Sequence, residues 1–387
     1  MSPLPSDAVL SELRAVDGLV GRLLAARAAL RSNRLIAPLD VAIHRERFLQ
    51  AWEEGEPFDP QFRYAEPEKA NDELEAIRCE AATAGGPWHR LVADEAERSL
   101  EAHLAHIRHD AEHITRISAA EYGTPDAALL GDALALLAAP APVVPDELRR
   151  SLDAARASAV MTAVLAAEGL DGWSTRLVDG SAALMSVNGS RRLISIRADA
   201  HFTVQQLVRL TVHEIGTHVF RWANAERGPL VLGLRLSGNT GTEEGLGAWH
   251  EQHFAAAFPP DRRFALRVVA VHAALRSGFT DVVRALVPHT DVRSAFDITV
   301  RVKRGLPDTG APGGFLKDHV YLGGLRAVER HLRDRPGDHR TLMTVKWPLH
   351  RLALLDGLDM ATALPGPLRL PDKALAQRAR TLATVEA

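Results

Sequence analysis

The chain has 387 residues, a formal net charge of −3 and a single cysteine, Cys79. This length suggests two or three domains with a large buried core, and the nearly balanced charge argues against a nucleic-acid-binding protein. One cysteine excludes a disulfide framework within the chain. It also excludes a metal site built on cysteine pairs, so any metal must be bound by histidines and carboxylates.

The N-terminal residues lack the basic start and apolar core of a signal peptide. No stretch reaches the apolar length that is needed to span a bilayer. We therefore expect a soluble, cytoplasmic protein that does not interact with membranes, and we leave its oligomeric state open.

Helices are expected along most of the N-terminal region, because alanine, leucine and arginine abound in it. A proline-rich run at 140–145 marks a boundary, so we divide the chain into a helical N-terminal region, 1–140, and a catalytic region, 141–387. Four clustered histidines have no catalytic glutamate beside them in a zinc-peptidase arrangement, and we interpret them as solvated or core residues: His103, His106, His109 and His113. The spacing of apolar residues predicts helices at about 6–32, 41–52, 68–83, 87–108, 111–121 and 124–139.

The segment before the central motif predicts a helix followed by a small sheet. Residues 147–169 have a helical pattern, and Asn188-Gly189 is a strong hairpin signal. We expect an antiparallel sheet built from strands at 175–178, 183–187 and 193–196. A further helix should follow from Thr203 to about Ala225, with Thr203 and Gln206 at the spacing of a capping box.

That helix carries the motif His213-Glu214-Ile215-Gly216-Thr217-His218. Imidazole nitrogens and a carboxylate suit Zn²⁺, and Glu214 could take a proton from a water molecule that attacks a carbonyl. Two unrelated histidines on a buried helix are the alternative. We favour a metal, because an unpaired glutamate beside two histidines in an apolar helix would be costly to bury.

The spacing of the two histidines predicts a distorted helix. The usual zinc-peptidase motif places its histidines four residues apart, which leaves the side chains about 40° apart around the helix axis, whereas five residues leave them about 140° apart. A π-type turn with one extra residue would bring His213 and His218 together. Gly216 would ease the distortion.

An acidic pair, Glu243-Glu244, follows in a helix that we expect to begin at Thr242. Adjacent helical residues point about 100° apart, so only one of the two carboxylates can readily bind the same ion. The other could orient a histidine from outside the ligand set.

These motifs resemble the microtubule-associated tyrosine carboxypeptidases and their bacterial relatives, over roughly 145–345. A third matching segment is Gly-Gly-Phe-Leu-Lys-Asp-His-Val-Tyr-Leu-Gly at 313–323. The resemblance implies one zinc ion bound by His213, His218 and Glu244, with Glu214 as the base, and it leaves Glu243 for the orienting role. Gly247 stands where alanine is usual in the family, and we expect this departure to matter little.

The sequence therefore predicts an α+β, mostly α-helical protein with a zincin-like catalytic core and a small antiparallel sheet before the motif helix. We expect a zinc-dependent peptidase that acts on a peptide or protein C-terminus, and the resemblance implies release of an aromatic residue. Tyr321 is the candidate oxyanion donor, with core packing as the alternative. Arg304 and Lys317 are candidates for binding the substrate carboxylate, with a solvated charge as the alternative.

Two other functions stay open from the sequence. One is a zinc hydrolase of a non-peptide amide or ester, and the other is a non-catalytic, metal-stabilised regulatory protein. An intact Glu214 argues against the second, because a structural site has no use for a base.

Overall fold

The computed structural model describes residues 6–30, 32–66, 72–140, 144–179, 183–255, 262–356 and 358–385. The chain forms two compact units. The first comprises residues 1–140, 234–241 and 261–323, and the second comprises 141–233, 242–260 and 324–387. No helix in these described ranges is both long and apolar enough to cross a membrane.

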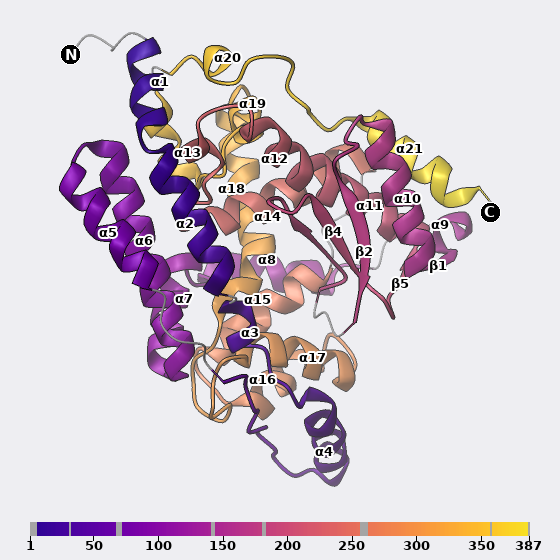
Figure 1. Cartoon of the computed structure of the whole chain (residues 1–387). Helices are drawn as coiled ribbons and strands as arrows, with labels where there is room; N and C mark the ends of the chain where they lie inside the picture. The colour runs from indigo at the N-terminus through magenta and orange to yellow at the C-terminus, as the bar shows by residue number, and fades with distance from the viewer. Residues whose placement is uncertain are drawn as a thin grey trace. The chain divides into compact units, whose positions relative to one another are not determined.

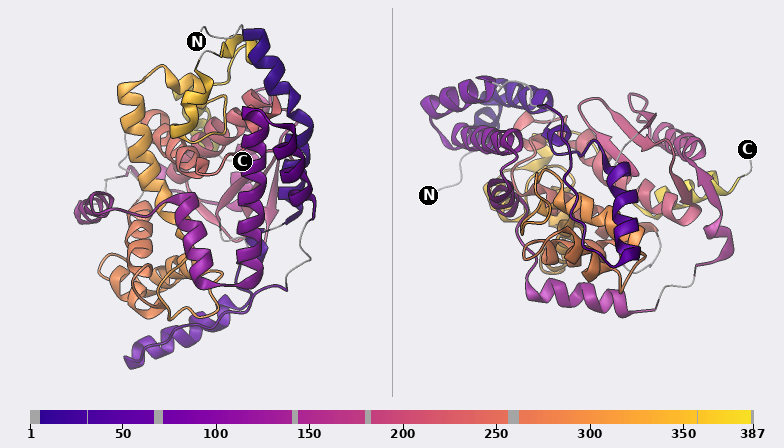
Figure 2. Two further views of the ribbon diagram at one scale, coloured as in Figure 1. Left: turned by 90° about the vertical axis from the view of Figure 1, so that its left-hand side faces the viewer. Right: turned by 90° about the horizontal axis from the view of Figure 1, so that it is seen from below.

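The first unit is built from helices. In it α5 and α6 form a helical hairpin whose members lie side by side in all views (Figures 1 and 2). The predicted helix at 6–32 is two helices, and residues 68–71 of another predicted helix lie outside the described ranges. The helices of this unit are α1 Ser6–Ala15, α2 Asp17–Leu30, α3 Ser32–Leu35, α4 Val41–Glu54, α5 Asp72–Ala84, α6 Pro87–Arg108, α7 Ala111–Tyr122, α8 Ala127–Ala138, α15 Arg262–Ala274, α16 Phe279–Leu286, α17 Val292–Lys303 and the 3₁₀ turn Leu316–His319.

The second unit combines helices with two small sheets. Its strands are β1 Ser151–Asp153, β2 Ser174–Val178, β3 Met185–Asn188, β4 Leu193–Arg197 and β5 His201–Thr203. Its helical elements are α9 Asp146–Arg149, α10 Ala154–Ala167, α11 Val204–His213, the π turn Glu214–Val219, α12 Phe220–Ala225, α13 Leu230–Gly233, the π turn Glu251–Ala255, α19 Asp338–Leu342, the 3₁₀ turn Leu349–Leu355, α20 Met360–Ala363 and α21 Lys373–Thr384. Two further helices, α14 Asn239–His250 and α18 Val320–Asp334, have residues in both units.

The three-stranded sheet has the order β2-β4-β3 and is mixed. β3 and β4 form the antiparallel hairpin expected at Asn188-Gly189, but β2 pairs with β4 in parallel, so the purely antiparallel sheet was wrong for one of its two pairings. The reason lies in β4, where Ile194 and Ile196 are fully buried. Their apolar alternation suits the central position, and β4 therefore lies between the two strands that precede it in the chain.

One short strand pairing was not anticipated. Residues 147–169 were expected to form one helix, but β1 interrupts them and pairs with β5 in an antiparallel two-stranded sheet. The side chain of Asp153 then accepts a hydrogen bond from the backbone N–H of Arg156 and caps α10. β5 leads directly into α11, so this pairing anchors the start of the motif helix.

The motif helix packs within the second unit. α11 lies against the C-terminal helix α21, and α10 contacts both α21 and the strands β2 and β4 (Figure 1). The predicted capping box at its start is confirmed: Thr203 accepts a hydrogen bond from the backbone N–H of Gln206, and the Gln206 side chain accepts one from the backbone N–H of Thr203. The mostly helical α+β class is also as expected.

Candidate metal centre

The two motif histidines lie at either end of a π turn. α11 ends at His213, the turn comprises Glu214–Val219, and α12 continues the same helix from Phe220. The predicted π turn is therefore confirmed. Its extra residue absorbs the surplus rotation of the five-residue spacing, and the two imidazole ring centroids lie 4.9 Å apart.

Gly216 contributes to this turn mainly through its size. A Cβ at this position would lie 2.9 Å from Leu375 Cδ2 and 3.0 Å from Pro371 Cβ. The glycine thus lets the segment around the start of α21 approach the turn closely.

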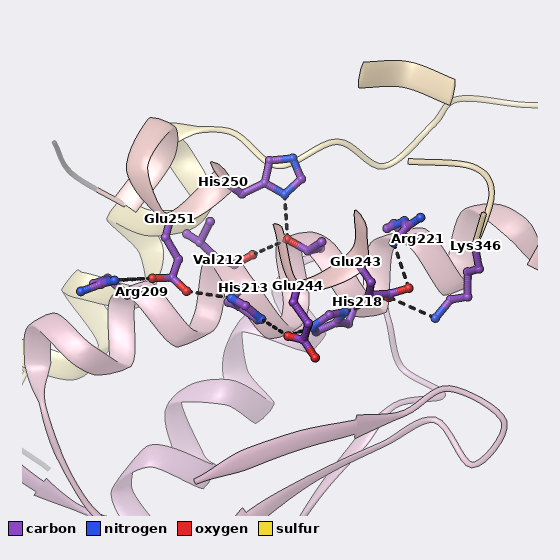
Figure 3. A network of polar contacts seen from close by, with 11 residues as sticks. Arg209, Val212, His213, His218, Arg221, Glu243, Glu244, His250, Glu251 and Lys346 are labelled. Carbon is purple, nitrogen blue, oxygen red and sulfur yellow. Dashed lines mark hydrogen bonds and ion pairs between the residues drawn. The ribbon is translucent and has the colours of Figure 1, made fainter. Parts of the chain in front are cut away.

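His213, His218 and Glu244 form a group of three whose ligand atoms all lie within 4.8 Å of one another (Figure 3). The Glu244 Oε2 atom is 3.4 Å from His213 Nε2 and 3.9 Å from His218 Nε2. A tetrahedral zinc ion with bonds of about 2.05 Å requires ligand atoms roughly 3.3 Å apart. The spacing and chemistry of this donor set therefore fit Zn²⁺ with little adjustment.

Each histidine also has a carboxylate at its other ring nitrogen. His213 Nδ1 lies 2.7 Å from Glu251 Oε1, and His218 Nδ1 lies 2.9 Å from Glu243 Oε1. A carboxylate accepts hydrogen bonds and cannot donate, so both rings carry a proton on Nδ1, which leaves Nε2 as the nitrogen that would bind a metal. This arrangement is typical of histidines that bind metals.

Cations stabilise these two carboxylates: Arg221 is buried, and Arg209 and Lys346 are half-buried. Arg209 binds Glu251 at 2.6 and 2.9 Å, while Arg221 and Lys346 lie 2.9 and 3.3 Å from Glu243. Burial alone would raise the pKa of both glutamates. The cations and the histidines outweigh that effect and hold the pKa of Glu251 below, and that of Glu243 well below, the usual range. Both side chains are therefore ionised acceptors.

The charge state of the motif itself follows from burial and from its neighbours. Burial would lower the pKa of His213, but Glu244 and Glu251 outweigh it and raise that pKa well above the usual value. Metal binding at Nε2 of His213 would release the proton from that nitrogen. Burial also raises the pKa of Glu214, although His213 and His218 oppose the shift.

The helix that carries the acidic pair Glu243-Glu244 begins earlier than predicted. α14 begins at Asn239, so Thr242 lies inside the helix, where its hydroxyl accepts a hydrogen bond from the backbone N–H of Leu349. Gly245 follows the acidic pair at a close crossing of α14 and α18, since its Cβ would lie 2.2 Å from the carbonyl carbon of Gly324. The crossing supports Glu244 beside the two histidines.

Gly247 lies directly against the ring of His213, and the expectation that its departure from alanine matters little stays a prediction. A Cβ at position 247 would lie 2.6 Å from Cε1, 2.8 Å from Nδ1 and 2.9 Å from Nε2 of His213. These distances are shorter than van der Waals contact, so an alanine here would displace the imidazole ring. Sequence reasoning missed this constraint because it treated the position as part of a helix and not as the surface beneath a ligand.

Glu251 and Arg209 were also missed, although their spacing held a signal. Glu251 is seven residues after Glu244, which returns to the same helix face after two turns. Arg209 is four residues before His213, on the same face of α11.

The other predicted site residues belong to the first unit, and their catalytic roles stay predictions. The Tyr321 ring stacks on Phe264 with centroids 5.3 Å apart, and the guanidinium of Arg267 lies 4.5 Å from its centroid. The Arg304 guanidinium lies 4.3 Å from the ring centroid of Phe315.

Lys317 is half-buried in the 3₁₀ turn Leu316–His319. The next residue, Asp318, is buried and makes a bidentate ion pair with Arg301 at 2.5 and 2.9 Å. Within the matching segment at 313–323, Asp318 therefore takes part in a structural ion pair.

Comparison with known proteins adds to this geometry. The family model described as microtubule-associated tyrosine carboxypeptidase matches residues 46–385, a wider range than the motifs cover. Human microtubule-associated tyrosine carboxypeptidase 1 is 38% identical over 164 residues, which are 39% of this chain and 33% of the relative. The mouse protein of that name is 34% identical over 161 residues, with the same coverage. Human putative tyrosine carboxypeptidase MATCAP2 is 31% identical over 198 residues, 49% of this chain and 37% of the relative. These alignments span about a third of the relatives' length.

Proposed function

Because the chain belongs to the microtubule-associated tyrosine carboxypeptidase family, we propose that it is a zinc-dependent carboxypeptidase. Its substrate is the C-terminus of a peptide or protein, and the names of the relatives point to tyrosine, an aromatic residue, as the one released. The observation that carries the proposal is the convergence of His213, His218 and Glu244 within 4.8 Å, with Glu214 beside the first histidine.

His213, His218 and Glu244 would hold one zinc ion. When bound, zinc supplies a Lewis acid that polarises a carbonyl oxygen and eases deprotonation of water. Glu243 would orient His218 by accepting the proton of its Nδ1–H, since the two atoms lie 2.9 Å apart. The chain's own contribution is thus a largely buried, pre-arranged ligand set.

Glu214 is the general base in this proposal. It takes the proton of the attacking water and then passes it to the nitrogen of the leaving residue. Tyr321 is the proposed donor to the oxyanion, and Arg304 or Lys317 the proposed cation for the substrate carboxylate. We also propose a cytoplasmic location, where the exposed Cys79 would stay reduced.

The test is a screen of peptides that differ in their C-terminal residue, with and without a zinc chelator. Release of single C-terminal residues that stops with the chelator is the expected result. Glu214→Gln should keep zinc and the fold but lose turnover, because the amide cannot accept the proton. Turnover of amides or esters without peptide cleavage would instead indicate a non-peptide hydrolase, and zinc binding without any turnover would indicate a regulatory protein.

A further inference from the structure

One face of α14, continued by the π turn Glu251–Ala255, contacts His213 at three points. Glu244, Gly247 and Glu251 are spaced three and four residues apart, so they follow one another along this face. Glu244 Oε2 lies 3.4 Å from Nε2, and Glu251 Oε1 lies 2.7 Å from Nδ1. Gly247 lies between them beneath the ring, where a Cβ would be 2.6 Å from Cε1.

We propose that Glu251 and Arg209 are positioning residues, which together determine the tautomer of the metal ligand His213. The proposal rests on the zinc centre proposed above. It assigns a role to two residues outside the ligand set, and neither of them needs to touch the metal or the substrate.

The pair fixes the tautomer through its two oxygens. Glu251 Oε2 accepts hydrogen bonds from Nε and Nη2 of Arg209, and this leaves Oε1 to accept the proton of His213 Nδ1–H. Glu251 and Arg209 have side-chain exposures of 7% and 16%, so water competes little for these bonds. Arg209 precedes His213 by one turn of α11, and Glu251 thus links two adjacent positions of the motif helix.

Glu251→Gln gives a sharp test because an amide has one oxygen and one NH₂ group. If the amide oxygen accepts from Arg209, the NH₂ group donates to His213 Nδ1 and forces the ring proton onto Nε2, which then cannot bind metal. The reverse orientation places NH₂ against the donors of Arg209. Either arrangement should weaken zinc binding about 10- to 100-fold.

The measurement is the zinc dissociation constant of the full chain by chelator competition. The matched control is Glu226→Gln, because Glu226 also pairs with an arginine, Arg192, at 2.9 Å but touches no motif residue. It should bind zinc like the wild type. Equal affinity in Glu251→Gln and in the control would overturn the proposal.

A measurement on the wild type covers the case in which the variants fail to fold. ¹⁵N NMR of the zinc-loaded, histidine-labelled protein should show a protonated Nδ1 on His213, and an unprotonated Nδ1 would also overturn the proposal. His213→Ala separates this inference from the proposed function. Loss of zinc in His213→Ala with normal binding in Glu251→Gln contradicts the inference alone, while retention of zinc in His213→Ala contradicts the zinc centre.

Discussion

Removing the Thr217 hydroxyl should destabilise the π turn from within. Thr217 and His250 are both fully buried, and Thr217 Oγ1 lies 2.7 Å from His250 Nδ1. The other ring nitrogen of His250 lies 2.9 Å from His339 Nε2, so polar contacts link the three side chains in series. Thr217→Val keeps the β-branched shape but leaves one nitrogen of His250 without a partner.

The magnitude follows from the burial of this nitrogen. A hydrogen bond between neutral groups contributes about 1 kcal/mol, and a buried polar atom left without a partner costs about 1–3 kcal/mol in total. Burial holds the pKa of His250 well below its usual value, so the ring cannot escape the penalty by becoming charged and drawing in water. We expect the free energy of unfolding to fall by about 1–3 kcal/mol.

Urea unfolding followed by tryptophan fluorescence measures this loss. Trp249 is a local probe, because its ring centroid lies 5.5 Å from that of His250 and 5.4 Å from that of His339. Thr217→Ser is the control, since it keeps the oxygen and removes only a methyl group, which costs about 1 kcal/mol. If Thr217→Val unfolds at the same urea concentration as the wild type, with an unchanged dependence of the unfolding free energy on urea, the reasoning about the buried Thr217–His250 contact is refuted.

Three further predictions concern the metal, the pH dependence and the helix crossing. The wild type should contain one equivalent of zinc by metal analysis, and His213→Ala and Glu244→Ala should each lose it; full zinc in both variants would contradict the ligand set. Burial, with the nearby His103, His109 and Arg304, lowers the pKa of His106 from 6.5 to about 4. Between pH 4 and pH 6.5, His106 binds a proton in the unfolded chain but not in the folded chain. The contribution of His106 to the free energy of unfolding is therefore fully present above pH 6.5 and is lost as the pH drops. At about 1.4 kcal/mol per pH unit, the loss reaches about 3 kcal/mol near pH 4. His106→Leu should flatten this part of the stability profile, and an identical profile would contradict the assignment. Gly245→Ala should destabilise by about 1–3 kcal/mol in chemical unfolding, because its Cβ would lie 2.2 Å from the backbone of Gly324. Gly241→Ala, on the same helix with no described neighbour within 4 Å of its Cβ, should be neutral or stabilising, and equal effects of the two changes would contradict the close crossing.

Local patterns were sufficient for the parts of the site that lie within one stretch of chain. The five-residue spacing of His213 and His218 required a π turn because helix geometry leaves no other way to bring both rings together. The capping box at Thr203 and the hairpin at Asn188-Gly189 likewise depend on neighbouring residues, and all three features are present.

Contacts between distant segments were decided only by the tertiary structure. The sequence alone determined the helical class and the π turn. It narrowed the acidic candidate ligand to Glu243 or Glu244, and the resemblance to the family selected Glu244. The sequence did not determine that β4 takes the central position of its sheet, that Glu251 bonds to His213 from 38 residues away, or that Gly247 lies beneath the ring of His213. The physical reason is that helix periodicity is a property of a dozen consecutive residues. The partner of a buried nitrogen, and the space beneath an imidazole, depend on which faces pack against each other.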